Sequence, residues 1–500
     1  MQRAPESLRR RRSARDAPCG IRLSELPQLR PPPGAAASAD RAAGSERAVT
    51  EWIAHAAAAR RHRDWSAADA ALRRALLAAD RAGEFAQVGD VLSAVGEYER
   101  ACEAYGRALA LDPDQPRYLF NRAALRRFVG ALAEAEQDYD RVIALDPSDA
   151  EAWLNRSELR RQTSARNHVE ALERHLAAGL DTSSQEVPIR YALAKELEDL
   201  GRYTDAWRHL VRGAELRRRQ FDYDVRIDLA TFEWIIQAFP IQHSAGAGNA
   251  SPEPIFIVGM PRTGTTLLER LMGGSAEVFA AGELPHFAAA LTDAVRARLG
   301  KPRIPRQEMV ATSASLDFDR LGADYLDRTR PGTLERPRFT DKMPLNFLYC
   351  GLIRRALPNA RIVHVTRHPL ATCHAVFKTL FNRGYPFSYD LAELAEYFVG
   401  YRRLMAHWHR AHPGEILDVS YERLVGDSAA ETRRVFEFCG LDWNPGILDT
   451  QRPGAPMTTA SAAQARQPIY TSSVDLWHRY APALEPVAVR LRRAGIALED

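Results

Sequence analysis

The pattern of apolar and polar positions divides the chain into two parts with different periodicity. From about residue 50 to residue 240 the chain reads as one helix after another. From about residue 253 onward, short apolar runs alternate with helical segments. Three of these runs are strand candidates, at residues 254–258, 361–366 and 415–419, and residues 338–340 form a weaker fourth one after Pro337. This alternation predicts an α/β domain with a central parallel sheet.

The helical part contains an internal repeat. Gly96 and Gly130 lie 34 residues apart, and so do the Asp-Pro pairs that end at Pro113 and Pro147. A period of 34 residues, with a small residue at the turn and Asp-Pro closing the second helix, resembles the tetratricopeptide repeat (TPR). The resemblance implies an α-helical solenoid of antiparallel helix pairs over residues 47–242.

The partner of such a solenoid is left open by the sequence. Its concave face could hold a peptide or another protein, or it could dock on the neighbouring domain or on a second copy of this chain. Residues 243–252 are rich in Gly, Ala and Ser, so we expect a linker there. The domain that follows would cover residues 253–500.

The basic charge of the chain lies in its first residues. Residues 1–46 mix Arg, Pro, Ala and Ser without periodicity, so we expect a disordered basic tail. Residues 1–50 hold ten Arg against five Asp and Glu, a net charge of +5, while the whole chain carries +4. The rest of the chain therefore sums to −1, which predicts no nucleic-acid surface on the folded part.

Composition favours a cytoplasmic protein without membrane insertion. No run approaches the roughly 18 consecutive apolar residues of a membrane helix. The five cysteines are scattered and never spaced as C-x-x-C, which argues against disulfides and a zinc site and favours a reducing compartment. Lysine is rare, with four among 68 Lys and Arg residues, so each lysine raises the question whether its site needs an ammonium group.

A glycine-rich loop follows the first strand candidate. Gly259 and Gly264 have the G-x-x-x-x-G spacing of a phosphate-binding loop, in which backbone N–H groups and the start of the next helix bind an anion. A nucleotide triphosphatase would need Lys where this chain has Thr265, and the cation lies inside the loop as Arg262. This arrangement argues against ATP hydrolysis. The candidate ligand-binding residues of the loop are Pro261, Arg262, Thr263, Gly264, Thr265 and Thr266.

The sequence P-R-T-G-T-T after a strand resembles the 5′-phosphosulfate loop of the sulfotransferase family. The resemblance extends over residues 253–500. It implies a P-loop-type sulfotransferase domain that uses 3′-phosphoadenosine 5′-phosphosulfate (PAPS) as co-substrate. No metal is expected, because the donors already present make Mg²⁺ unnecessary.

The segment that resembles the family's 3′-phosphate site departs from its pattern at two positions. Arg367 matches, but His368 stands in the Asp position and Ala375 stands in the Ser position. Thr372 or His374 could supply the missing hydrogen bond. These departures keep open a second interpretation, which is a non-catalytic TPR scaffold with a degenerate nucleotide-binding module.

Further segments also resemble this family. Residues 340–347, and residues 459–470 with the stretch that ends at Trp477 and Tyr480, are similar to its bacterial branch that carries tetratricopeptide repeats. The later region closes over the nucleotide in the family, which implies PAPS contacts from Ser461, Gln464 and Arg466. Tyr421 begins an element similar to the family's Y-E-x-L, where Tyr packs near the adenine. A core tyrosine is the alternative for this position.

Three residues are candidates for catalysis by resemblance to tyrosylprotein sulfotransferases. Glu283, which follows a short strand expected at residues 278–281, would take the proton of the acceptor hydroxyl. It could instead be a helix N-cap, with His286 as the second candidate base. Lys342 would contact the bridging oxygen of PAPS, and Arg262 would contact the sulfuryl oxygens. Lys342 could also be a surface charge, and Asp341 could hold it by a salt bridge.

Taken together, the resemblance implies an enzyme that moves a sulfuryl group from PAPS to a hydroxyl acceptor. The match to tyrosylprotein sulfotransferases favours a protein tyrosine as the acceptor, with a small-molecule or glycan hydroxyl as the alternative. A P-loop kinase is disfavoured by Thr265.

Overall fold

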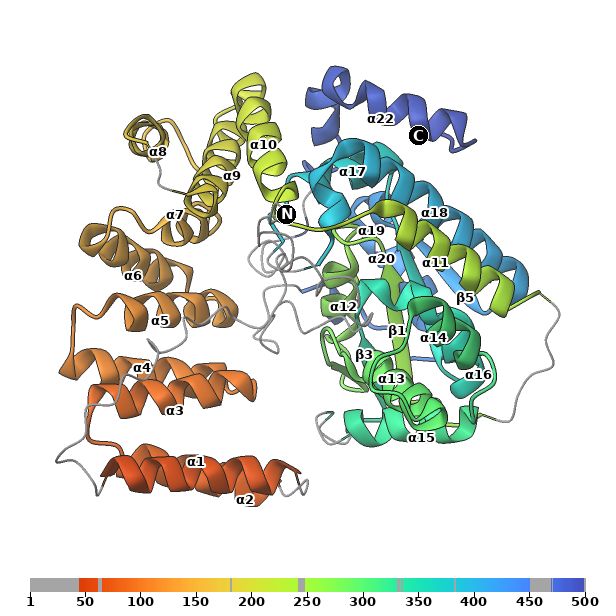
Figure 1. The fold of residues 1–500 in the computed structure, drawn as a ribbon, viewed down its shortest axis with the longest axis horizontal. Helices are drawn as coiled ribbons and strands as arrows, with labels where there is room; N and C mark the ends of the chain where they lie inside the picture. The colour runs from red at the N-terminus through yellow and green to blue at the C-terminus, as the bar shows by residue number, and fades with distance from the viewer. Residues whose placement is uncertain are drawn as a thin grey trace, which may run out of the picture. The chain divides into compact units, whose positions relative to one another are not determined.

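The computed structural model contains two compact units, and the chain passes from the first to the second between Arg217 and Arg218. The first unit is helical and the second is built around a sheet (Figure 1). The expected tail at residues 1–46 falls almost wholly outside the described part of the chain. No helix of the described part has the length and the apolar character needed to cross a membrane. The described residues are 45–61, 65–179, 182–241, 248–330, 333, 336–381, 384–449, 469 and 471–498.

The first unit is a row of helices in which α1 packs on α2, α3 on α4, and α5 on α6. Its helices are α1 (Ser45–Arg61), α2 (Trp65–Ala78), α3 (Ala82–Ala94), α4 (Tyr98–Leu111), α5 (Pro116–Val129), α6 (Leu132–Leu145), α7 (Ala150–Ser157), α8 (Val169–Ala177), α9 (Ser183–Asp199) and α10 (Tyr203–Arg218). Gly96 and Gly130 make equivalent left-handed turns, with φ angles of 87° and 89°. Tyr105 and Tyr139 are equivalent and fully buried. The predicted helical repeat is therefore confirmed.

The second unit contains a five-stranded, all-parallel sheet in the order β2-β3-β1-β4-β5. All four strand candidates of the apolar pattern are strands, and so is the short segment expected before Glu283, which is β2. The predicted parallel α/β domain is therefore confirmed. The strands are β1 (Pro254–Gly259), β2 (Val278–Ala280), β3 (Arg338–Asp341), β4 (Arg361–Thr366) and β5 (Ile416–Ser420).

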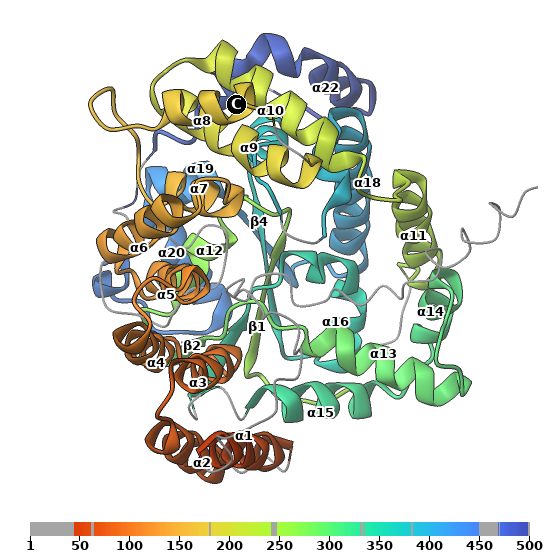
Figure 2. The ribbon, with the colours of Figure 1, turned by 60° about the vertical axis from the view of Figure 1, so that its left-hand side comes forward.

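Helices lie on both faces of the sheet (Figure 2), and alternate side chains of β1 pack on opposite faces. Ile255 and Ile257 share one apolar core with residues of α12 and α20. Phe256 lies on the other face, where its ring contacts Phe287 of α13 and Tyr325 of α15. The helices of this unit are α11 (Val225–Ala238), α12 (Thr265–Met272), α13 (His286–Leu299), α14 (Arg306–Ser313), α15 (Phe318–Thr329), α16 (Cys350–Ala356), α17 (Pro369–Phe377), α18 (Leu391–Ala411), α19 (Tyr421–Gly426), α20 (Ser428–Cys439) and α22 (Ala481–Arg493).

The second unit begins earlier than the expected boundary after residue 242, because α11 packs on α18. Phe232 of α11 is buried, and its ring lies 6.0 Å from that of Phe347 and 5.2 Å from that of Tyr397. The helical pattern of α11 does not differ from that of the repeats. The residues against which α11 packs assign it to the unit that contains the sheet, and these contacts cannot be read from the sequence.

Only the end of the expected linker is described, since residues 242–247 fall outside the described ranges. The backbone N–H of Asn249 donates to the carbonyl oxygen of Ala356 at 2.9 Å. This part of the linker is therefore tied to the second unit.

Candidate active site

The carboxyl ends of the five parallel strands carry the candidate site residues. The loop at residues 260–264 follows β1, Glu283 follows β2, and Lys342 follows β3. Arg367 follows β4, and Tyr421 follows β5. Parallel strands end at one edge of a sheet, and open α/β sheets bind their ligands at that edge. Three candidates lie outside the described residues, namely Ser461, Gln464 and Arg466.

Close contacts of its backbone and side chains fix the conformation of the loop between β1 and α12. Gly264 has a φ of 100°, and a Cβ atom there would lie 2.4 Å from Cδ2 of Tyr421. Thr263 Oγ1 donates to the carbonyl oxygen of Met260 at 2.8 Å. Arg262 has a positive φ of 67°, a conformation that costs a non-glycine residue about 1–2 kcal/mol. Local strain in a loop that enters a helix N-terminus is typical of an anion-binding site.

Glu283 and Lys342 form a direct ion pair. Nζ of Lys342 lies 2.5 Å from Oε1 of Glu283, and the lysine side chain is fully buried. The backbone N–H of Lys342 also donates to the carbonyl oxygen of Gly282 at 2.9 Å, which fixes the two strand ends against each other. Lys342 is therefore not a surface charge. Glu283 is not the N-cap of α13 either, because that helix begins at His286 with Pro285 as its N-cap.

The acidic partner that the structure gives Lys342 is thus Glu283 rather than Asp341. Asp341 is fully buried and accepts hydrogen bonds from Tyr325 Oη at 3.0 Å and from Asn346 Nδ2 at 3.2 Å. Burial raises the pKa of Asp341 to about 8. This carboxyl group therefore anchors the end of β3 to its neighbours.

Glu269 connects three elements of the site, although no motif pointed to it. Its side chain is buried, and Oε1 accepts hydrogen bonds from the backbone N–H of Gly282 and from Oγ1 of Thr340, both at 2.9 Å. Burial raises the pKa of Glu269. The carboxyl group thus ties α12 to the two strand ends that carry the ion pair. The signal in the sequence is an acidic residue one helical turn after Thr265, on the helix that the loop enters.

Two replacements of Glu269 test this connection. Glu269→Ala leaves two donors without an acceptor, at about 1–3 kcal/mol for each, so we expect a lower thermal midpoint. Glu269→Gln keeps a carbonyl oxygen that can accept both hydrogen bonds, so we expect its thermal midpoint to stay near wild type. Thermal unfolding followed by circular dichroism is the measurement. Equal behaviour of the two variants would contradict the positioning role.

His286 pairs with α15. Its Nδ1 lies 3.0 Å from Oγ1 of Thr329, and that hydroxyl donates to the carbonyl oxygen of Tyr325 at 2.9 Å. The hydroxyl proton is therefore used, so Nδ1 of His286 is the donor. Burial lowers the pKa of His286, which favours a neutral ring with Nε2 as its proton acceptor. His286 stays the second candidate base.

Arg367 links the loop after β1 to the end of β5. Its Nη1 donates to the carbonyl oxygen of Arg262 at 3.2 Å, and its guanidinium carbon lies 4.7 Å from the ring centroid of Tyr421. Its Nη2 donates to the carbonyl oxygen of Ser473 at 2.5 Å, and Oγ of Ser473 lies 2.6 Å from the Tyr421 hydroxyl. Ser473 lies in the stretch between residue 470 and Trp477. The sequence did not single it out within that stretch, so only the fold reveals it beside these residues.

The segment after β4, which departs from the family's 3′-phosphate pattern, packs against aromatic residues of the second unit. The ring of His368 stacks on that of Trp477, with centroids 4.5 Å apart and planes at 11°. Oγ1 of Thr372 donates to a main-chain oxygen of the preceding turn at 3.3 Å. The ring of His374 lies 4.5 Å from that of Tyr480. His368 therefore has an aromatic partner. Thr372 and His374, the two residues that could supply the missing hydrogen bond, are both buried.

Comparisons with known proteins connect both units to families. The family model described as "Sulfotransferase family" matches residues 254–445. The model described as "TPR repeat" matches residues 89–126. Both resemblances that the sequence motifs indicated are confirmed.

The matches to individual proteins cover only part of one chain or the other, or have low sequence identity. An uncharacterized protein of Aquifex aeolicus is 33% identical over 321 residues, which are 62% of this chain but 42% of that protein's length. A putative protein-tyrosine sulfotransferase of Caenorhabditis briggsae is 27% identical over 236 residues, or 45% of this chain and 80% of that protein. Among solved structures, the sulfotransferase domain of the Synechococcus PCC 7002 olefin synthase is 18% identical, with a TM-score of 0.35. That match covers 47% of this chain and 91% of the other.

Proposed function

From the match of residues 254–445 to the sulfotransferase family, we propose that this protein transfers the sulfuryl group of PAPS to a hydroxyl acceptor. The observation that carries the proposal is the buried ion pair of Glu283 and Lys342, at 2.5 Å, beside the strained loop that follows β1. A base, a cation and an anion-binding loop are what sulfuryl transfer requires, since the reaction depends on placement and on charge stabilisation.

The donor nucleotide would lie along the carboxyl edge of the sheet. Backbone N–H groups of residues 262–266, with the hydroxyls of Thr265 and Thr266 at the start of α12, would bind the 5′-phosphosulfate, and Pro261 would line the loop. Arg367 would bind the 3′-phosphate, and Tyr421 would lie near the adenine. We expect additional contacts from Ser461, Gln464 and Arg466.

In the proposed reaction the acceptor oxygen attacks sulfur in line with the bond that breaks. A new S–O bond forms while the bond between sulfur and the bridging oxygen of PAPS breaks. Glu283 takes the proton of the acceptor hydroxyl. Arg262 and Lys342 stabilise the negative charge on the sulfuryl and bridging oxygens, and adenosine 3′,5′-bisphosphate leaves.

The ion pair suggests how the base becomes free to act. In the described state Nζ of Lys342 donates to Oε1 of Glu283, so that oxygen already has a proton donor. When PAPS binds, Nζ would turn toward the bridging oxygen. Oε1 would then be open to the acceptor hydroxyl, so donor binding would prepare the base.

For the acceptor we infer a protein tyrosine. Four of the relatives carry protein-tyrosine sulfotransferase in their names, at 22% to 27% identity. A helical repeat also offers an extended surface suited to a polypeptide. A small-molecule or glycan hydroxyl is the alternative, and acceptor panels with tyrosyl, seryl and sugar hydroxyls distinguish these classes.

Calorimetry with adenosine 3′,5′-bisphosphate tests the nucleotide site. We expect one site per chain with a Kd of about 10 µM or tighter, and weak or no binding of ATP. Arg367→Ala should weaken binding by about tenfold or more, because it removes a charge-assisted contact to phosphate. Arg361→Ala, at the exposed start of the strand that Arg367 follows, is the matched control and should bind like wild type. Absence of binding at high micromolar nucleotide would overturn the enzyme proposal and favour a non-catalytic scaffold.

A further inference from the structure

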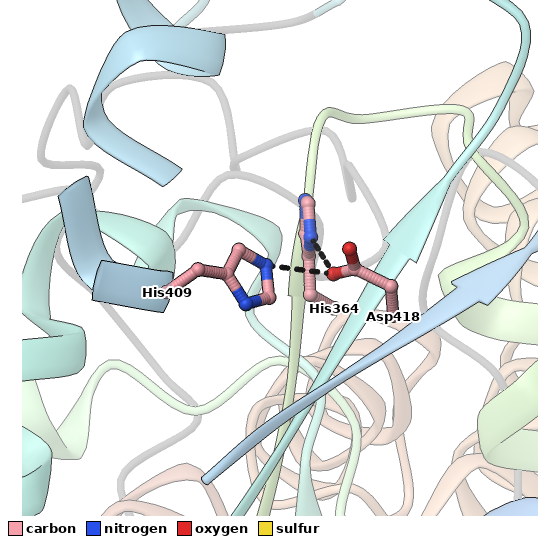
Figure 3. A group of neighbouring side chains, drawn as sticks. All are labelled: His364, His409 and Asp418. Carbon is pink, nitrogen blue, oxygen red and sulfur yellow. Dashed lines mark hydrogen bonds and ion pairs between the residues drawn. The ribbon is translucent and has the colours of Figure 1, made fainter. Parts of the chain in front are cut away.

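Two histidines and an aspartate converge on one face of the sheet (Figure 3). His364 lies on β4, and Asp418 lies directly opposite it in the register of β5. His409 comes from α18. Their spacing in the sequence follows no metal-binding pattern, which is why the motifs gave no sign of this group.

Both imidazole rings point at one carboxylate oxygen. Nδ1 of His364 lies 2.7 Å from Oδ1 of Asp418, and Nε2 of His409 lies 2.9 Å from the same atom. One nitrogen of each ring and one carboxylate oxygen all lie within 4.8 Å of one another. We propose that His364, His409 and Asp418 bind a divalent transition-metal ion, for which Zn²⁺ is the best match.

The donor set and the spacing suit this ion. Zn²⁺ takes imidazole nitrogen and carboxylate oxygen at about 2.0–2.2 Å, so its ligand atoms lie about 3.3 Å apart in a tetrahedral site. The present separations of 2.7 and 2.9 Å therefore need to open by about half an ångström. Three protein ligands from regular elements leave a fourth position for water, as in an open zinc site.

The surroundings of the group also fit an ion site. The second ring nitrogen of His364 is hydrogen-bonded to the hydroxyl of Tyr401, which is buried on α18. Such an outer partner fixes the orientation of a ligating imidazole. The His364 side chain is 3% exposed, whereas those of His409 and Asp418 are 33% and 55% exposed, so an ion can enter from solvent.

The charges around the group act on a cation in both directions. The hydrogen bond to Asp418 raises the pKa of His409, so a proton competes with a cation for that ring. Burial lowers the pKa of His364, which keeps that ring neutral and able to ligate. Partial burial opposes ionisation of Asp418, but the hydrogen bonds from the two histidines hold its pKa well below the usual value. The positive charge of Arg402 reaches both imidazoles and works against a cation. The Asp418 carboxylate, which itself becomes a ligand, offsets that charge.

Metal titration of the full chain, stripped with a chelator beforehand, tests the proposal. We expect calorimetry to show one Zn²⁺ per chain with a Kd of about 10 µM or tighter. His409→Ala and Asp418→Asn should each weaken binding by about tenfold or more. His412→Ala is the matched control, because His412 pairs with Glu415 just after α18 and stands outside the group. It should bind Zn²⁺ like wild type.

A second readout reports whether the ion binds the folded unit. Zn²⁺ at saturating concentration should raise the thermal midpoint of the wild type and of His412→Ala by a few degrees, and should raise it less in the two ligand variants. Co²⁺ should give visible absorption bands that Zn²⁺ abolishes. Absence of binding at about 100 µM Zn²⁺, or equal binding by wild type, His409→Ala and Asp418→Asn, would overturn the proposal.

Discussion

Glu283→Gln is expected to lower label transfer from PAPS by about 10²–10⁴-fold, the contribution of a general base. Glutamine keeps the size of the side chain and an oxygen that can accept from Nζ of Lys342, which lies 2.5 Å from Glu283. It cannot take up the acceptor proton. We therefore expect the affinity for adenosine 3′,5′-bisphosphate and the thermal midpoint to stay close to wild type.

A second ion pair in the same unit provides the control for this variant. Lys301 and Glu308 are partly exposed, and Nζ lies 2.7 Å from Oε1. Glu308→Gln makes the same chemical change in a pair to which we assign no catalytic role, so transfer should be unchanged. If Glu283→Gln transferred label at the wild-type rate, the base would have to be another group, with His286 as the next candidate.

Lys342→Arg is expected to lower transfer by about 10²–10³-fold, the usual effect of losing one donor to a developing anion. The Lys342 side chain is fully buried, and its ammonium group is compact enough to approach a single oxygen. A forked guanidinium is larger and planar, and forcing it into a filled site costs about 1–3 kcal/mol. This substitution is informative because the chain otherwise uses Arg for nearly all of its 68 basic residues.

The stability cost of Lys342→Arg must be separated from its effect on chemistry. Circular dichroism at the assay temperature gives the folded fraction, and kcat is then compared per folded molecule. Lys301→Arg, at the exposed pair, should leave both quantities unchanged. Wild-type kcat for folded Lys342→Arg would contradict a specific role of the ammonium group.

The strands and the loop of this unit could be predicted from the sequence because local features carry them. Apolar runs at residues 254–258 and 361–366 end where β1 and β4 end or one residue before. Gly264 and Arg262 adopt the positive φ angles that a strained anion-binding loop requires. The order of strands is a different matter, since it depends on tertiary contacts. The order β2-β3-β1-β4-β5 is what brings Glu283 beside Lys342.

Residues that act through contacts across the fold could not be found in the same way. Glu269 belongs to no motif, and Ser473 was not singled out within its segment, so each is recognised only by the groups with which it forms hydrogen bonds. Asp341 adjoins Lys342 in sequence, which made it a candidate ion-pair partner. In the structure, however, Lys342 pairs with Glu283, which lies in the loop after β2. The helical pattern of α11 likewise gave no sign that its apolar side chains pack on α18.

The central claim is that this chain transfers a sulfuryl group from PAPS. The most direct measurement incubates purified full-length protein with PAPS radiolabelled on sulfur and an acceptor panel of tyrosyl peptides, sugars and small phenols. We predict label on at least one hydroxyl acceptor, with release of adenosine 3′,5′-bisphosphate, and strong loss of both in Glu283→Gln and Lys342→Arg. Label transfer that is equal in wild type and both variants, or absent with every acceptor including a host lysate, would contradict the account.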